Sequence, residues 1–77
     1  MKMPTLTQIA TNLVCVTSKD VDVYFSYAVC IAFRVDGRLY MSENVWSRTT
    51  GKHLNMISPD ATRMPYAEFE QAWVDAV

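Results

Sequence analysis

The dipeptide Asp36-Gly37 is the feature that most limits how this chain can fold, because it separates two runs rich in β-branched and aromatic residues, 28–35 and 38–43. Glycine adopts a positive φ without a Cβ clash and aspartate tolerates one, so the pair favours a two-residue type I′ turn. We therefore predict that the two runs pair as neighbouring antiparallel strands. A two-residue loop sets three cross-strand pairs: Val35 with Arg38, Arg34 with Leu39, and Phe33 with Tyr40.

Two earlier runs, 12–18 and 21–27, also have the length, the alternation and the β-branched content of strands. Lys19-Asp20 marks a turn between them. Residues 5–10, "TLTQIA", fit either a single helical turn or a first strand, and 61–64 is a candidate for a short strand. The sheet is therefore expected to hold three to four antiparallel strands.

The hydrophobic spacing changes to a helical period after Asn44. The residues with this spacing are Trp46, Thr49 or Thr50, His53, Leu54 and Ile57. They predict a helix over 47–57, which Ser47 or Asn44 caps and which ends at Ser58-Pro59.

A second helix is expected around Pro65, a residue type that suits the first helical position. Its apolar stripe consists of Tyr66, Phe69, Trp73 and Ala76. Strands followed by helices indicate an α+β domain, a small antiparallel sheet of three to four strands with two helices on one face. The other face would be partly solvated or paired with another chain.

The size and charge of the chain exclude several classes of protein. Its 77 residues suffice for one domain, 1–77, and 51% of them are hydrophobic. A net charge of −1 does not fit a strongly basic nucleic-acid binder. The sequence has no run of about 18 apolar residues and no signal-peptide pattern, so we expect a cytoplasmic protein without a membrane segment.

Cys15 and Cys30 lie inside apolar runs, without the clustered ligands that a metal site requires. Two buried free thiols in a reducing cytosol are one interpretation, and a disulfide between adjacent strands is the other. The glycine-rich nucleotide-binding motifs and the metalloprotease motif are missing as well. We therefore expect no metal and no cofactor.

The run "VWSRTTGKHLNMI", 45–57, gathers hydroxyls, bases and the single histidine of the chain, and three interpretations are open. Thr49 or Thr50 beside His53 on a helix suggests a nucleophile–base pair, hence a minimal hydrolase built on Thr50 and His53, although no orienting carboxylate is placed locally. A structural hydrogen-bond network at the helix start, with His53 packed under the sheet, is the second. Recognition of a partner is the third.

The recognition interpretation depends on side chains that are expected to point outward. Arg48 and Lys52 are four residues apart on the exposed side of the predicted helix, next to several hydroxyls. Candidate contacts for a nucleic acid or nucleotide are Arg48, Lys52, His53 and Arg63. Candidate contacts for a protein partner are Arg48, Lys52, Tyr24 and Arg34.

Residues 25–55, "FSYAVCIAFRVDGRLYMSENVWSRTTGKHLN", resemble a group of short uncharacterised proteins that bacteriophages encode. The matching positions are Ser26, Tyr27, Ile31, Ala32, Tyr40, Trp46, Ser47, Thr49, Thr50, His53 and Asn55. Ala28-Val29-Cys30 departs from the Thr-Pro-Val of the group, which puts the start of that strand in doubt. No activity of the group is known, so no catalytic residue carries over.

The resemblance implies a phage accessory protein, and small proteins of this kind act by binding. Our first hypothesis is a non-enzymatic protein that binds and inhibits or modulates a bacterial host protein or defence complex in the bacterial cytoplasm, including an anti-CRISPR or other anti-defence role. This hypothesis includes a form in which the binding protein is a homodimer. The second hypothesis is a small nucleic-acid or nucleotide binder that uses the basic, hydroxyl-rich helix start, and the third is the hydrolase.

Overall fold

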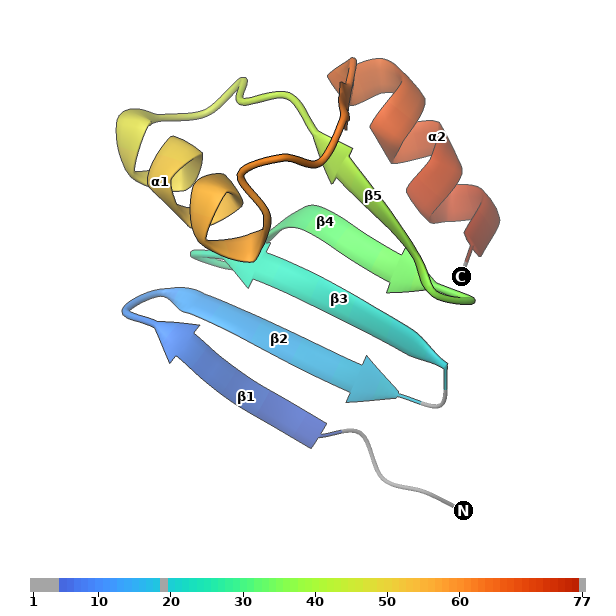
Figure 1. Ribbon diagram of the computed structural model, residues 1–77, viewed down its shortest axis with the longest axis horizontal. Coiled ribbons are helices and arrows are strands. Elements are labelled where there is room, and N and C mark those ends of the chain that lie inside the picture. Colours follow the sequence, from blue (N-terminus) through green and yellow to red (C-terminus); the bar gives the residue numbers. More distant parts are fainter. Residues whose placement is uncertain (1–4, 19, 77) are drawn as a thin grey trace.

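The computed structural model describes residues 5–18 and 20–76. Over these residues six strands form one sheet in chain order, and two helices pack on it (Figure 1). Neighbouring strands are antiparallel except β5 and β6, which are parallel. The elements are β1 (Thr5–Ala10), β2 (Leu13–Ser18), β3 (Val21–Ser26), β4 (Val29–Val35), β5 (Arg38–Ser42), α1 (Arg48–Ile57), β6 (Arg63–Met64) and α2 (Tyr66–Ala76).

The Asp36-Gly37 turn joins β4 to β5 as predicted. Both residues have a positive φ, 52° at Asp36 and 78° at Gly37, as a type I′ turn requires. The three predicted cross-strand pairs are all observed: Val35 with Arg38, Arg34 with Leu39, and Phe33 with Tyr40. Because neighbouring pairs alternate in direction, Arg34 and Arg38 point to opposite faces of the sheet.

The sheet has six strands where the sequence predicted three to four. The predicted runs 12–18 and 21–27 are β2 and β3, with Asp20 in the turn between them and Lys19 outside the described residues. The ambiguous first run is strand β1, which sequence periodicity did not identify because none of its residues is buried. Strand β6 has two residues, too few to produce a periodic pattern.

Helix α1 confirms the predicted helix and its cap. It begins directly after Ser47, whose side-chain oxygen accepts a 3.2 Å hydrogen bond from the backbone N–H of Thr50. This bond satisfies one of the amides that a helix start leaves without an intrahelical partner. At the other end, the backbone N–H of Ser58 donates to the carbonyl of Leu54, and Pro59 follows.

The two helices lie on opposite faces of the sheet, so the prediction of both on one face is wrong. Leu54 of α1 packs in a cluster with Ala32 and Met41. Phe69 of α2 packs in a different cluster, with Phe33. Successive strand residues point to opposite faces, so the neighbours Ala32 and Phe33 assign the two clusters to the two faces.

The order of the elements explains this placement. β5 and β6 are parallel neighbours, so the segment between them must cross one face of the sheet, and α1 belongs to that crossover. Helix α2 follows β6 on the other face, where Phe69 and Trp73 each have ring centroids 5.5 Å from that of Phe33. We name the two surfaces of the sheet the α1 face and the α2 face. The side chain of Ala76, the last residue of the predicted stripe, lies outside what the structure describes.

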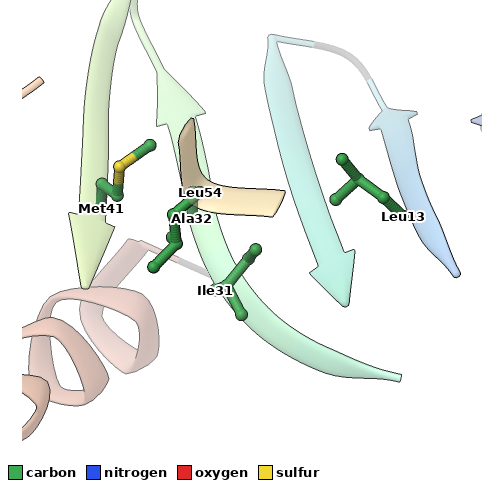
Figure 2. Packing of buried hydrophobic residues seen from close by; sticks show 5 residues of the cluster. All are labelled: Leu13, Ile31, Ala32, Met41 and Leu54. Carbon is green, nitrogen blue, oxygen red and sulfur yellow. The ribbon is translucent and has the colours of Figure 1, made fainter. Parts of the chain in front are cut away.

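Figure 2 shows the buried cluster on the α1 face. Its members are Leu13, Ile31, Ala32, Met41 and Leu54. Strict alternation along a strand would put Ile31 on the same face as Phe33. A β-bulge opposite Tyr24 and Phe25 shifts the register, and Ile31 therefore packs on the α1 face.

Cys15 and Cys30 are free thiols. Cys15 is the register partner of Tyr24, which packs on the α1 face, whereas Cys30 packs on the α2 face. β3 also separates their strands, so the two sulfurs are not placed to form a disulfide. Burial raises the pKa of the Cys30 thiol to about 11.

Candidate functional site

A buried cluster of hydroxyls and an imidazole joins α1 to the end of β3. Ser26 Oγ lies 2.7 Å from His53 Nδ1 and 3.3 Å from Thr50 Oγ1. The Ser47 hydroxyl in turn donates to Thr50 Oγ1 at 3.3 Å. Ser26 and His53 are only 1% and 4% exposed, so the contact between them is closed to solvent.

This cluster supports the structural interpretation of His53 over the hydrolase hypothesis. The described partners of the Thr50 hydroxyl are Ser26 and Ser47, not His53. A nucleophile must also reach a substrate, and both Thr50 and His53 are buried. We therefore infer that the hydrogen bonds of this cluster hold α1 on the sheet.

An apolar groove of about 380 Å³ opens over β1 and β2. Its lining residues are Leu6, Asn12, Val14, Val16, Phe25, Tyr27 and Ala28, and we name it the β1–β3 groove. Val16 is the register partner of both Leu6 and Val23, and Val23 packs under α2, so the groove lies on the α2 face. Figure 1 shows β1 at the edge of the sheet farthest from that helix. Leu6 therefore remains 66% exposed and Tyr27 54%.

The turn between β3 and β4 lies at the rim of this groove, and its backbone is strained. Tyr27 and Ala28 have φ values of 59° and 105°, which residues other than glycine rarely adopt. The backbone N–H of Tyr27 donates to the carbonyl of Asn12 at 2.9 Å, and Asn12 itself has a φ of 61°. Two neighbouring turns are thus held together at one end of the groove. Strained backbone of this kind persists only where surrounding contacts fix it, and it clusters at binding sites.

Three bases form a row along α1 and β6. Arg48 and Lys52 are exposed and lie four residues apart. Asn55 continues the same side of the helix, and its side-chain oxygen accepts a hydrogen bond from the guanidinium of Arg63. Arg63 therefore lies on the same side of α1 as the predicted pair of bases, Arg48 and Lys52. We name Arg48, Lys52 and Arg63 the cationic row.

The other three predicted binding residues lie elsewhere. His53 is buried. Tyr24 and Arg34 are half-buried on the α1 face of β3 and β4, and burial is the main cause that raises the pKa of Tyr24. The register partner of Arg34 is Asp22, a carboxylate that accepts a 2.7 Å hydrogen bond from Thr17. The six predicted residues therefore do not form one site.

Sequence reasoning missed the β1–β3 groove and the partner of His53. Val14, Val16 and Phe25 have the pattern of strand residues, and that pattern does not say which part of a sheet a helix will cover. One signal pointed to Ser26: it belongs, with His53, to the positions that match the phage-encoded proteins.

Among the described residues, no group of three or more His, Cys, Asp or Glu side chains could hold a metal ion. Neither helix in this part of the chain combines the length and the apolar character that crossing a membrane requires.

The chain is similar to one family model, which is described as a family of unknown function (DUF8033) and matches residues 1–71. No curated protein and no solved structure matches the chain.

Proposed function

We propose that this chain, which belongs to the DUF8033 family of unknown function, acts by binding another protein through the β1–β3 groove. The observation that carries the proposal is the exposure of apolar groups there, 66% for Leu6 and 54% for Tyr27. Contiguous exposed apolar surface on a small domain marks a site of interaction. A partner that covers the groove would remove this surface from water, which is the main driving force of protein association.

The free edge of β1 adds a second element of recognition. β1 is an edge strand, and its residues 5–10 carry no charged side chain. In natural proteins, charged side chains on an edge strand commonly prevent it from pairing with a strand of another molecule. An edge strand without charged side chains can accept such a further strand. A partner strand beside β1 would form backbone hydrogen bonds and would direct alternate side chains over the groove.

The proposed partner is a bacterial protein, including a host defence complex such as a CRISPR effector. This part of the proposal is supported by the resemblance of residues 25–55 to phage-encoded proteins and by the small size of the chain. Inhibition would be steric, because the bound domain would cover a surface that the target needs. The proposal places the chain in the bacterial cytoplasm and requires neither a cofactor nor a catalytic step. A second copy of the chain is the alternative occupant of the groove.

The groove can be tested with Leu6→Asp, which puts a charge where the apolar side chains of a partner would lie. Val74→Asp is the matched control, because Val74 is 59% exposed on α2 and does not line the groove. The wild type and both variants, each tagged, are incubated with bacterial lysate, and the retained proteins are compared by quantitative mass spectrometry. Each candidate is then purified and its affinity is measured by isothermal titration calorimetry.

The proposal requires that at least one bacterial protein binds the wild type and Val74→Asp equally well. The same protein must bind Leu6→Asp at least about tenfold more weakly, which is a loss of about 1.4 kcal/mol of binding free energy. Circular dichroism must show the same fold for all three chains. If Leu6→Asp binds every candidate as tightly as the wild type, the groove is not the binding site. If sedimentation shows a dimer of the pure chain that Leu6→Asp separates, the occupant is a second copy.

A further inference from the structure

We propose a second binding site, in which the cationic row of Arg48, Lys52 and Arg63 binds the phosphate backbone of duplex nucleic acid. The row lies on α1 and β6 and shares no residue with the β1–β3 groove. α1 and the groove lie on opposite faces of the sheet. The two sites can therefore be tested independently.

Two members of the row, Arg48 and Lys52, lie on the side of α1 that faces away from the sheet. The buried side of this helix consists of Thr50, His53 and Leu54. A helix completes one turn every 3.6 residues, so Arg48 and Lys52 lie opposite that side. Both are exposed. The helix thus presents its bases along a ridge that an extended ligand can reach.

Positive charge is concentrated in this part of the chain. Residues 44–64 contain the three bases and a single acid, Asp60, whereas the whole chain has a net charge of −1. Arg63 donates its hydrogen bond to the amide oxygen of Asn55, an uncharged acceptor, so this contact does not neutralise the guanidinium. A local positive field of this kind attracts a polyanion even when the total charge is slightly negative.

The length of the row fits a short stretch of duplex backbone. From Arg48 to Asn55, which holds Arg63, the helix advances about 10 Å at 1.5 Å per residue. One strand of a duplex carries a phosphate about every 3.4 Å along the axis, so the row spans roughly three phosphates. Thr49 is exposed beside Arg48, where its hydroxyl can donate to a phosphate oxygen.

A duplex fits this ridge better than a single strand does. Proteins that bind single strands stack the bases on exposed aromatic rings, and α1 contains no Phe, Tyr or Trp. Trp46, just before the helix, is half-buried and makes an edge-to-face contact with Tyr66, with ring centroids 5.5 Å apart. The ridge therefore offers charges and hydroxyls for a backbone and no platform for bases.

Fluorescence anisotropy with a labelled DNA duplex of about 16 base pairs tests the site. Three phosphate contacts predict that the affinity falls about 40-fold between about 50 and about 200 mM salt. Arg48→Gln and Lys52→Gln each remove one contact, so each should lower the salt slope by about 0.9 and weaken binding roughly tenfold at about 50 mM salt. Arg38→Gln is the matched control, because it removes the same charge from an exposed position beside the β4–β5 turn, and it should leave the slope unchanged.

The proposal is supported if the duplex binds, the two row variants bind more weakly and Arg38→Gln does not, with the same circular dichroism spectrum throughout. If the duplex does not bind at low salt, or if Arg38→Gln weakens binding as much as Arg48→Gln, the proposal is overturned. Polyglutamate replaces the duplex in a parallel titration. If it binds as tightly as the duplex, the row recognises acidic polypeptides and the assignment to nucleic acid is wrong.

Discussion

Ser26 Oγ lies 2.7 Å from Nδ1 of His53, so the last residue of β3 is bonded to the buried side of α1. The two residues are 27 positions apart in the chain. Tyr27, the residue after Ser26, has its ring centroid 6.0 Å from that of His53 and lines the β1–β3 groove. The same short segment therefore both fixes the helix and places an aromatic side chain in the lining of the β1–β3 groove.

Replacing Ser26 with alanine is expected to lower the free energy of unfolding by about 1–3 kcal/mol, because it leaves His53 Nδ1 and the Thr50 hydroxyl without this buried partner. Urea denaturation measures the effect. Ser18→Ala is the matched control, because Ser18 is exposed at the end of β2 and its loss should change stability by less than about 0.5 kcal/mol. Similar losses for the two variants would mean that the Ser26 contact contributes nothing to stability.

The cap of α1 makes a separate prediction. Ser47→Ala removes the side-chain oxygen that accepts from the Thr50 amide at 3.2 Å and should cost about 1 kcal/mol in unfolding free energy. Ser47→Asp keeps an acceptor and adds a negative charge at a helix start whose first turn contains no acid, so it should retain most of the wild-type stability. An aspartate variant no more stable than the alanine variant would argue against the cap.

The features that the sequence predicted depend on neighbouring residues. The β4–β5 pairing follows from two turn residues, Asp36 and Gly37, whose backbone conformation fixes the register of the adjoining strands. Helix α1 follows from apolar spacing and from Ser47 at its start. Neither requires knowledge of the rest of the fold.

The features that the sequence did not predict depend on distant pairing. The helices lie on opposite faces because β6 pairs with β5 in parallel. A strand of two residues is too short to have a sequence pattern that would predict this pairing. The groove exists because α2 packs around Phe33 and leaves Leu6 uncovered. Ile31 changes face because of a bulge whose position depends on β3. Alternation along a single strand contains none of this information.

The strain at the β3–β4 turn predicts an unusual stabilising substitution. Ala28 has a φ of 105°, a region that glycine occupies freely and alanine does not. Ala28→Gly should therefore raise the melting temperature, with a gain of up to about 1 kcal/mol after the entropy that glycine loses on folding. Differential scanning calorimetry measures both quantities.

Ala67→Gly is the control for this substitution. Ala67 is exposed in the first turn of helix α2, where the same change should destabilise the protein by up to about 1 kcal/mol. The two alanine-to-glycine changes are thus expected to have opposite signs. If Ala28→Gly also destabilises the protein, the turn does not hold Ala28 in a strained conformation.

The partial burial of Cys30 predicts slow alkylation in the folded protein. The pKa of this thiol is raised from 9.0 to about 11, so its thiolate fraction near pH 8 falls about 100-fold, a factor of ten for each unit of pKa. In a Cys15→Ala background, iodoacetamide should react with Cys30 far more slowly in buffer than in concentrated urea, because the thiolate is the reactive form. Mass spectrometry follows the reaction, and equal rates in the two solvents would contradict the burial of this thiol.

The same pKa shift makes stability depend on pH in the alkaline range. Because the folded-state pKa of Cys30 is raised, the folded protein holds the thiol proton more strongly than the unfolded chain does. The stability that this provides is fully present below about pH 9 and is lost as the pH rises through about 11. Cys30→Ala removes this contribution, so its unfolding free energy should decline less than that of the wild type between those pH values. Urea denaturation at a series of pH values measures the two curves. Parallel curves would mean that Cys30 ionises as easily in the folded protein as in the unfolded chain.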